Sequence, residues 1–372
     1  MKLLFYFGGF APVGGIEVFC SNFLEELSEY PVNIDLLVWG KNSELLENIK
    51  KLKNVEVHRF FWRWGCRFGI PDKFILSYGK KLLRKADIVL FGKTFSPSIH
   101  FALDRIRSNH KPPFIYITPY RPSELWKYVW AKYYTKETIS QMLRTFYVIV
   151  VQGKNFADDL AQLGYQGRIE VIPYIVHHEQ AVMPLSDYRN VLRIGFLGRL
   201  EKAKNLDYLI NAFYLCKSTW QGKQKLELHL FGDGSEKFKL IDLVKKLNLI
   251  DSVIFHGQIS PFKVREVIDS CHMFAFSSIT EGQCLAGVEI LSRGRPIVGT
   301  PAGALPEIIK NEEIGLLAPY NNVKEYSKCL LRILNKIITG KIDPGKIRKY
   351  FEENFSRQVV IKKYWELLTS LL

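Results

Sequence analysis

Short apolar segments alternate with amphipathic segments along this chain, and the alternation runs through twice. In the first half, apolar runs typical of buried strands alternate with stretches whose apolar side chains recur at helical spacing. The first predicted helix spans 17–29, and the predicted strands lie at 2–7, 33–39, 88–91, 114–118 and 147–151. Because alternating strands and helices build βαβ units, we expect an α/β fold with a parallel sheet.

The alternation starts again after a polar segment. Residues 177–190 follow Val171-Ile172-Pro173, contain Pro184 and show no clear period, so we interpret them as an interdomain linker. The later predicted strands lie at 192–197, 225–231, 253–256, 273–277 and 296–299, with helices at 206–216, 238–247, 289–293 and within 350–372. We therefore predict two doubly wound, Rossmann-like domains, 1–176 and 177–355, and a C-terminal helix in 356–372 that packs back toward the first domain.

Composition narrows the class of partner without choosing one. The chain has 372 residues, a net charge of +15 and a pI near 9.4, which favours anionic partners such as nucleic acid, acidic lipid or phosphorylated ligands. Its six cysteines form no Cys-x-x-Cys pair or zinc-like spacing, so we expect buried thiols, a cytoplasmic location and no metal site. No apolar window reaches the ~18 residues that a membrane-spanning helix needs.

Two cations follow the first strand of the second series. Arg199 and Lys204 lie five residues apart where a predicted strand ends and a helix begins. A guanidinium fork and an ammonium group at such an edge can bind a diphosphate from two sides, and the helix start adds its N–H groups. A solvated basic loop is the alternative interpretation.

Two carboxylates, Glu281 and Glu289, flank a predicted strand-to-helix turn that contains Gly282. If the helix begins near Gly282, then Glu289 lies about two turns into it. There its carboxylate can accept hydrogen bonds from the vicinal hydroxyls of a ribose. An acidic residue that stabilises the helix start, with a surface glutamate behind it, explains the pair equally well.

Glycine-rich turns follow two further predicted strands. Gly14-Gly15-Ile16-Glu17 separates the first strand from the first helix, and residues 299–303 contain two glycines before Leu305-Pro306-Glu307. Glycines let the backbone approach a ligand closely, and such loops can direct N–H groups at an anion. Each of these motifs is weak evidence alone.

Together these residues resemble the family-4 retaining glycosyltransferases, glycosyl transferases group 1, which have the GT-B fold of two facing Rossmann-like domains with a donor and acceptor cleft between them. The resemblance runs from Gly14 to Leu317 and is best after Arg193. The family's motifs fall, in order, on Gly14, Gly15 and Glu17; on Arg199 and Lys204; on Gly232, Asp233 and Gly234; on Glu281 and Glu289; and on Leu305 to Ile308.

The resemblance implies a glycosyltransferase that takes a sugar from a nucleoside diphosphate sugar and uses no cofactor and no metal. It assigns catalysis to Glu281, Arg199 and Lys204, with Glu289 on the ribose and both cations on the leaving diphosphate. The implied donor-binding residues are Gly14, Gly15, Arg199, Lys204, Gly232, Gly282, Gln283, Cys284, Leu285 and Glu289. The implied acceptor is a glycan or a lipid-linked glycan of a bacterial surface polysaccharide, lipopolysaccharide or glycolipid.

This chain departs from the family pattern at three places. It has Gln283-Cys284 where members usually have Phe-Gly, which puts donor specificity in doubt, and Tyr174-Ile175 where the linker usually has Asn-Gly. It lacks a histidine after the strands that end at 91 and 118, where Lys93, Tyr120 or Arg121 would have to contact the acceptor. A degenerate, non-catalytic member or an epimerase-like enzyme therefore remains an alternative.

Two stretches of the first domain, 58–85 and 126–144, mix aromatic residues with lysine and arginine. This composition suits the surface of an anionic bilayer, so we expect a protein on the inner face of the cytoplasmic membrane. An amphipathic helix with aromatics packed inward accounts for it as well. Nucleic acid is disfavoured as a partner because it explains the charge but leaves the two glutamates unexplained. The absence of Gly-x-Gly-x-x-Gly after the first strand argues against an NAD-dependent enzyme.

Overall fold

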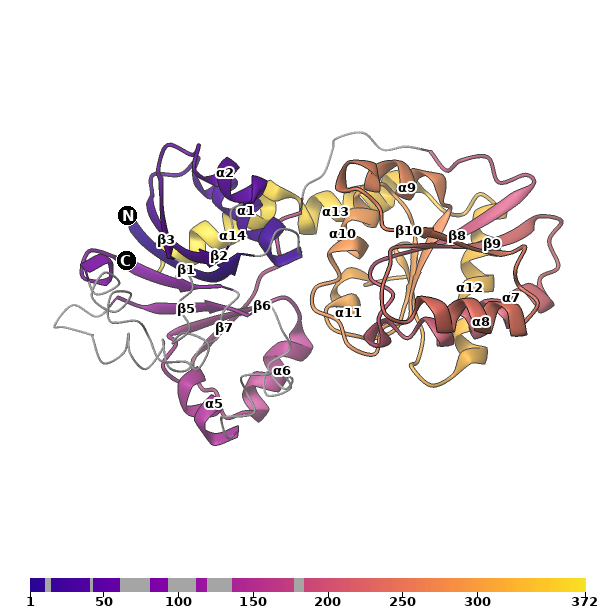
Figure 1. Cartoon of the computed structure of the whole chain (residues 1–372), viewed down its shortest axis with the longest axis horizontal. Coiled ribbons are helices and arrows are strands. Elements are labelled where there is room, and N and C mark those ends of the chain that lie inside the picture. Colours follow the sequence, from indigo (N-terminus) through magenta and orange to yellow (C-terminus); the bar gives the residue numbers. More distant parts are fainter. Residues whose placement is uncertain (11–14, 41–42, 61–80, 93–111, 119–135, 177–183) are drawn as a thin grey trace. The chain divides into compact units, whose positions relative to one another are not determined.

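The computed structural model describes residues 1–10, 15–40, 43–60, 81–92, 112–118, 136–176 and 184–372. Within them the chain forms two compact units, which we describe separately: Met1–Val176 with Arg357–Leu372, and His177–Ser356. Each unit contains one parallel sheet with helices (Figure 1). The predicted α/β class, with two doubly wound Rossmann-like units, is confirmed. None of the described helices is long and apolar enough to cross a membrane.

The first unit has a seven-stranded sheet of order β3-β2-β1-β4-β5-β6-β7, in which all neighbours are parallel. Its strands are β1 (Lys2–Phe10), β2 (Asn33–Gly40), β3 (Val55–Phe60), β4 (Ile88–Phe91), β5 (Phe114–Ile117), β6 (Val148–Val151) and β7 (Arg168–Val171). Its helices are α1 (Gly15–Leu27), α2 (Glu44–Ile49), α5 (Lys136–Leu143), α6 (Lys154–Gln162) and α14 (Arg357–Thr369). Every residue of β4, β5 and β6 is buried, as expected for central strands covered on both faces.

The second unit has a six-stranded parallel sheet of order β10-β9-β8-β11-β12-β13. Its strands are β8 (Val191–Leu197), β9 (Lys225–Phe231), β10 (Val253–Gly257), β11 (Met273–Phe276), β12 (Ile297–Gly299) and β13 (Gly315–Leu317). Its α-helices are α7 (Leu206–Thr219), α8 (Lys237–Lys246), α9 (Val264–Ser270), α10 (Leu285–Ser292), α11 (Leu305–Ile308), α12 (Val323–Ile338) and α13 (Pro344–Phe355), and its short 3-10 turns are η4 (Lys202–Lys204) and η5 (Pro261–Lys263).

The strand order reverses direction at β8, because β9 and β10 follow on one side and β11, β12 and β13 on the other. This is a topological switch point, and ligands of open α/β sheets bind beyond the carboxyl ends of the strands at such a point. The loops after β8 and β11 contain Arg199, Lys204 and Glu281. The topology therefore puts the strongest sequence candidates at one edge of one sheet.

The C-terminal segment is divided between the two units. The predicted helical region 350–372 breaks at Ser356, so α13 belongs to the second unit and α14 to the first. Helix α14 packs on α1, where the rings of Tyr364 and Phe23 lie 4.9 Å apart and Arg357 donates to Glu26 over 2.7 Å.

Candidate functional site

The loops after β8 and β11 are bonded to each other at the switch point. The Ser277 hydroxyl, at the end of β11, donates to the carbonyl oxygens of Lys204 and Asn205 over 2.8 and 2.9 Å. The Ile279 N–H donates to the carbonyl oxygen of Ala203 over 2.9 Å. These bonds hold Lys204 and Glu281, which are 77 residues apart in sequence, at the same place.

Lys204 and Glu281 form an ion pair. The ammonium group of Lys204 donates to the Glu281 carboxylate, and the two side chains are 19% and 10% exposed. A charged pair with so little contact to water attracts more strongly than one on the surface, and its charges can act on a ligand through a lower dielectric. The pairing also means that a bound anion would compete with Glu281 for Lys204.

Helix α10 begins directly after this pair. Its N-cap residue, Cys284, has a left-handed backbone with φ of 59°, and its thiol is buried. Burial, and then the nearby charge of Glu281, raises the pKa of the Cys284 thiol well above its usual range, which keeps it protonated at neutral pH. The side chain of Gln283 is buried beside it, and Leu285 opens the helix.

The loop after β12 is hydrogen-bonded to the turn between β11 and α10. The Ala304 N–H donates to the carbonyl oxygen of Gly282 over 2.9 Å. Gly303 has φ of 51°, and a Cβ there would lie 2.1 Å from the carbonyl oxygen of Glu281. Only glycine fits so close an approach, so Gly303 fixes the backbone that presents Glu281.

Glu289 lies in the second turn of α10 and is partly buried. Its carboxylate makes no hydrogen bond or ion pair with any residue that the structure describes. Burial raises its pKa to about 7. An unpaired carboxylate in such surroundings can accept hydrogen bonds from a ligand. In the first turn of α10 the Gly287 N–H already donates to the Cys284 carbonyl oxygen over 2.8 Å. The N–H groups that precede it at a helix start have no intrahelical acceptor, which is typical of anion-binding helix ends.

Arg199 lies in the same loop as Lys204 and forms an ion pair of its own. Its side chain is 77% exposed and donates to Glu201 over 2.6 Å. Joint binding of one diphosphate by Arg199 and Lys204 stays a prediction, since each cation pairs here with a carboxylate of the protein. An exposed ion pair of this kind contributes little, so Arg199 can exchange Glu201 for another anion at small cost.

Gly232 lies directly against the backbone of Gly198, at the carboxyl edge of the second sheet. A Cβ on Gly232, whose φ is 137°, would lie 1.9 Å from the carbonyl oxygen of Gly198. The Gly198 N–H donates to Phe231 over 3.0 Å, and the Leu200 N–H donates to Asp233 over 2.9 Å. The Gly-Asp-Gly segment thus holds the loop that carries Arg199.

Several predicted residues of the first unit lie outside the described residues: Gly14, Lys93, Tyr120 and Arg121. Gly15 begins α1, and Glu17 is buried in its first turn.

Ser277 and Ser278 belong to the site as well, although no role for them is predicted from the sequence. Besides the role of Ser277 given above, the Ser278 hydroxyl is buried without a hydrogen-bond partner in the described part of the chain, and the Thr300 hydroxyl donates to the Ser278 carbonyl over 2.6 Å. Their signal was a pair of hydroxyl residues at the end of a buried strand.

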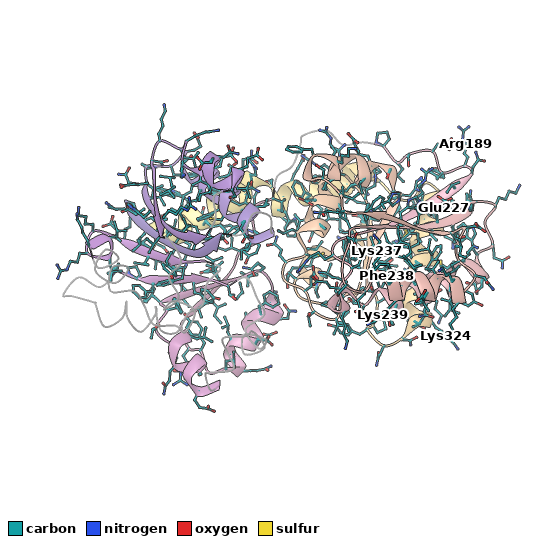
Figure 2. The ribbon with its side chains drawn as sticks, viewed as in Figure 1. Arg189, Glu227, Lys237, Phe238, Lys239 and Lys324 are labelled. Carbon is teal, nitrogen blue, oxygen red and sulfur yellow. The ribbon has the colours of Figure 1, made fainter. Side chains whose placement is uncertain are left out.

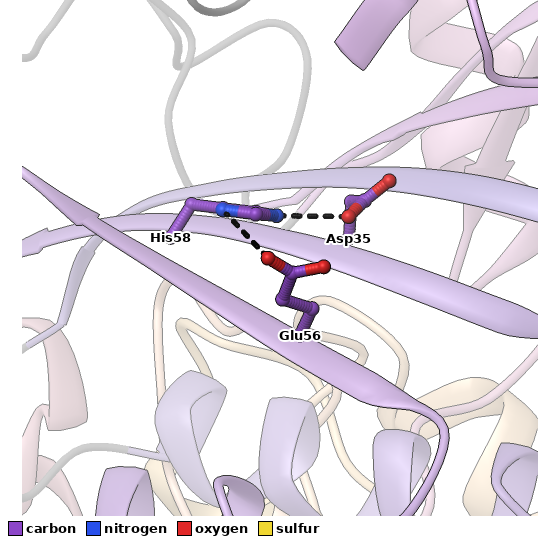
Figure 3. Close-up of side chains that lie close together, drawn as sticks. All are labelled: Asp35, Glu56 and His58. Carbon is purple, nitrogen blue, oxygen red and sulfur yellow. Dashed lines mark hydrogen bonds and ion pairs between the residues drawn. The ribbon is translucent and has the colours of Figure 1, made fainter.

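A second polar group lies on the neighbouring strands β2 and β3 of the first sheet (Figure 3). The His58 ring lies between Asp35, 2.8 Å from Nε2, and Glu56, 3.8 Å from Nδ1. These three side chains are of metal-ligand type. However, the Lys2 ammonium lies 3.1 Å from the other Asp35 oxygen, so a cation already compensates the buried carboxylate. We interpret the group as an ion-paired cluster that fixes edge strand β3.

Two family models match consecutive parts of the chain. Residues 13–180 match Glycosyltransferase Family 4, and residues 187–355 match Glycosyl transferases group 1. The uncharacterized glycosyltransferase MJ1069 of Methanocaldococcus jannaschii is 21% identical over 402 residues, with 100% of this chain and 99% of that protein covered. The putative colanic acid biosynthesis glycosyltransferase WcaL of Escherichia coli is 25% identical over 188 residues, covering 48% of this chain and 45% of WcaL.

Solved structures agree on the fold. The lipopolysaccharide outer core galactosyltransferase WaaB in its apo form aligns with a TM-score of 0.78 and 18% identity, with both chains covered completely. Anabaena HepE in complex with UDP aligns with a TM-score of 0.78 and 16% identity, again over 100% of both chains. Given these matches and the geometry above, the chain belongs to the family-4, group 1 glycosyltransferases and has the GT-B fold.

Proposed function

We propose that this glycosyltransferase is retaining and metal-independent, and that it moves a sugar from a nucleoside diphosphate sugar to a glycan or lipid-linked acceptor of bacterial surface polysaccharide, lipopolysaccharide or glycolipid synthesis. The observation that carries the proposal is the position of the Lys204–Glu281 pair at the switch point, where the loop with Glu281 leads into α10, the helix that bears the unpaired carboxylate of Glu289. The donor class is supported by the UDP bound to HepE, and the acceptor class by WaaB, a lipopolysaccharide galactosyltransferase, and WcaL, a putative colanic acid glycosyltransferase.

Each residue has a separate role in this proposal. The Glu289 carboxylate accepts the ribose hydroxyls, and the first-turn amides of α10 bind the diphosphate. Lys204 and Arg199 stabilise the negative charge that grows on the phosphate oxygen as its bond to the anomeric carbon breaks. Glu281 contacts the sugar. The acceptor hydroxyl attacks the anomeric carbon on the face that the diphosphate leaves, and its proton passes to the departing phosphate oxygen.

Metal independence has a physical basis in this proposal. In many transferases a divalent cation neutralises the leaving diphosphate. Here the two side chains Lys204 and Arg199 supply two positive charges at the same edge of the sheet. We propose that these charges replace the metal, so activity should survive chelation.

The test is nucleoside diphosphate release from a panel of UDP-, GDP- and ADP-sugars with EDTA present. The wild type is compared with Glu289→Ala and Arg199→Ala. Slow release from one donor, abolished by both substitutions, supports the proposal and identifies the donor. No release from any donor, together with no thermal stabilisation by any nucleotide, would point to a degenerate member of the family.

Membrane contact through the basic, aromatic stretches 58–85 and 126–144 is a further part of the proposal. Most of both stretches lies outside the described residues. Failure of the protein to bind anionic vesicles at low salt would contradict this part.

A further inference from the structure

Two histidines of the second unit lie ring to ring on neighbouring strands. His229 is on β9, and His256 is on β10, the edge strand of the sheet. Nδ1 of His229 lies 2.9 Å from Nε2 of His256, and the two ring planes are inclined by 16°. The two nitrogen atoms therefore face each other across the β9–β10 pair, and neither histidine has a part in the proposed transfer reaction.

A shift in strand register brings His256 to this position. Phe255 pairs with Leu230 in the ladder. The next pair joins Gly257 with Phe231, so His256 is an extra residue of β10. Such a bulge changes the direction of a side chain and is usually a functional feature of a strand. The His256 ring is exposed, and it stacks on the Phe231 ring with 4.3 Å between the centroids, which fixes its orientation.

A carboxylate orients the other imidazole. Glu227, which is also on β9 (Figure 2), has an oxygen 3.1 Å from Nε2 of His229. Burial alone would raise the pKa of Glu227, but hydrogen bonds from His229 and Lys225 lower it below its ordinary value, so the carboxylate is ionised at neutral pH. Because an ionised carboxylate only accepts hydrogen bonds, Nε2 of His229 carries the proton and Nδ1 has a lone pair. A carboxylate behind an imidazole is the usual arrangement of metal-binding histidines.

Both imidazoles are neutral at pH 7. Burial lowers the pKa of His229, against the effect of the Glu227 hydrogen bond, and burial and then the nearby His229 lower the pKa of His256. Metal ions bind neutral imidazole, so the pair needs no deprotonation. Without metal, Nε2 of His256 donates to Nδ1 of His229. When that proton moves to Nδ1 of His256, both lone pairs point toward the same position.

We propose that Nδ1 of His229 and Nε2 of His256 bind a divalent transition-metal ion of the kind that prefers imidazole, Cu²⁺ more tightly than Ni²⁺ or Zn²⁺. Metal–nitrogen bonds of ~2.0–2.1 Å to atoms 2.9 Å apart make an angle of about 90° at the metal. A right angle suits the tetragonal geometry of Cu²⁺ and Ni²⁺. In the part of the chain that the structure describes, no third side chain of ligand type joins the two nitrogens, so water or an outside ligand would complete the coordination.

The proposed metal site is separate from the candidate donor site. Its two ligands belong to β9 and β10, whereas Lys204 and Glu281 lie in the loops after β8 and β11. Metal-independent transfer concerns the leaving diphosphate and is not affected. Arg193 and Lys225 lie 3.8 and 3.1 Å from the carboxylate of Glu227. Because these cations repel a metal ion, we expect only metals with a strong affinity for nitrogen to bind.

The test titrates the full-length protein, without an affinity tag and stripped of metal, with Cu²⁺, Ni²⁺, Zn²⁺ and Mg²⁺ by calorimetry. Electron paramagnetic resonance of the bound Cu²⁺ counts its nitrogen ligands. His256→Gln removes one ligand at an exposed position. His58→Gln is the control, because His58 belongs to the other group of ligand-type side chains. Equal unfolding midpoints in EDTA show that the variants are folded.

We expect His256→Gln to weaken Cu²⁺ binding by about 100-fold or more and to remove one nitrogen from the resonance signal. Glu227→Gln should weaken binding on the order of tenfold, because the carboxylate only orients a ligand. Lys225→Ala, which removes a charge paired with the same carboxylate, should stay within about twofold of the wild type. The proposal is overturned if His256→Gln keeps the affinity and nitrogen count of the wild type, or if His58→Gln alone abolishes binding.

Discussion

At the scale of single residues, the fold shifts the pKa of Glu289, a candidate ligand-binding group, far enough to be measured. Burial raises its pKa to about 7, so the folded protein holds a proton there that the unfolded chain loses above its ordinary value of 4.5. The folded state therefore loses stability as pH rises from about 4.5 to about 7, and no further above that. Urea unfolding of the wild type and Glu289→Gln across this range should show the difference in slope.

The same pKa predicts how nucleotide binding depends on pH. An ionised carboxylate accepts hydrogen bonds from ribose hydroxyls better than a protonated one, so affinity should rise as pH passes through about 7. The phosphates of the nucleotide titrate as well, and Glu289→Gln separates the two effects because it removes only the carboxylate. If calorimetry gives the same pH profile for both proteins, Glu289 does not bind the ligand.

Lys204 and Lys202 both lie in η4, so substitution of Lys202 is a control for substitution of Lys204. Lys204 is bound to Glu281, whereas Lys202 is exposed. Lys204→Ala removes the positive charge that would stabilise the leaving phosphate, and it leaves Glu281 unpaired. We therefore expect kcat/KM to fall on the order of 100- to 1000-fold. Lys202→Ala should stay within about twofold of the wild type. Equal losses in steady-state assays would show that general surface charge, rather than the pair, matters.

Residue identities at the site were only partly predictable from the sequence. The spacing of Glu281 and Glu289 around a strand-to-helix turn placed both correctly near α10, although the helix begins at Leu285 and not at 289. The ion pair of Lys204 with Glu281 depends on side-chain positions that spacing cannot give. The hydroxyl bonds of Ser277 likewise connect loops that are distant in sequence.

At the scale of elements, the loops of the candidate donor site contain glycines because neighbouring backbone atoms leave no room for a side chain. Gly303→Ala would put a Cβ 2.1 Å from the Glu281 carbonyl oxygen and also strain a left-handed backbone. Gly340, after α12, has a similar φ of 65° but no atom within 4 Å of such a Cβ. We expect Gly340→Ala to cost about 1 kcal/mol of unfolding free energy from the backbone alone. Gly303→Ala should cost clearly more and also lower activity, as measured by urea unfolding and turnover.

The strands that are not predicted from the sequence, β3, β7 and β13, all lie at the edge of a sheet. β3 and β7 lie at the two edges of the first sheet, and β13 lies at an edge of the second and is three residues long. Edge strands are partly solvated, so their residues mix polar with apolar types; β7 reads Arg-Ile-Glu-Val. The central strands were found because covered parallel strands are continuous apolar runs.

At the scale of the whole molecule, the chain crosses between its two units twice, once near 177 and once at Ser356. The second crossing gives the first unit its final helix, α14, whose Tyr364 is fully buried against Phe19 and Phe23. Tyr364→Ala should therefore destabilise the first unit by about 3–5 kcal/mol, as for other large core aromatics. Nucleotide should still stabilise the second unit, which calorimetry would detect as a separate shift. Loss of nucleotide binding in this variant would contradict a nucleotide site that lies in the second unit.

The position of the bound nucleotide can be measured directly by hydrogen exchange with mass spectrometry. The full-length protein is compared with and without UDP, GDP or ADP, with EDTA present throughout. We predict that one nucleotide protects amides in 198–205 and 281–289, while 33–37 and 55–58 near Asp35 and His58 exchange unchanged. Protection confined to other segments, or by no nucleotide, would contradict a donor site at the switch point of the second sheet.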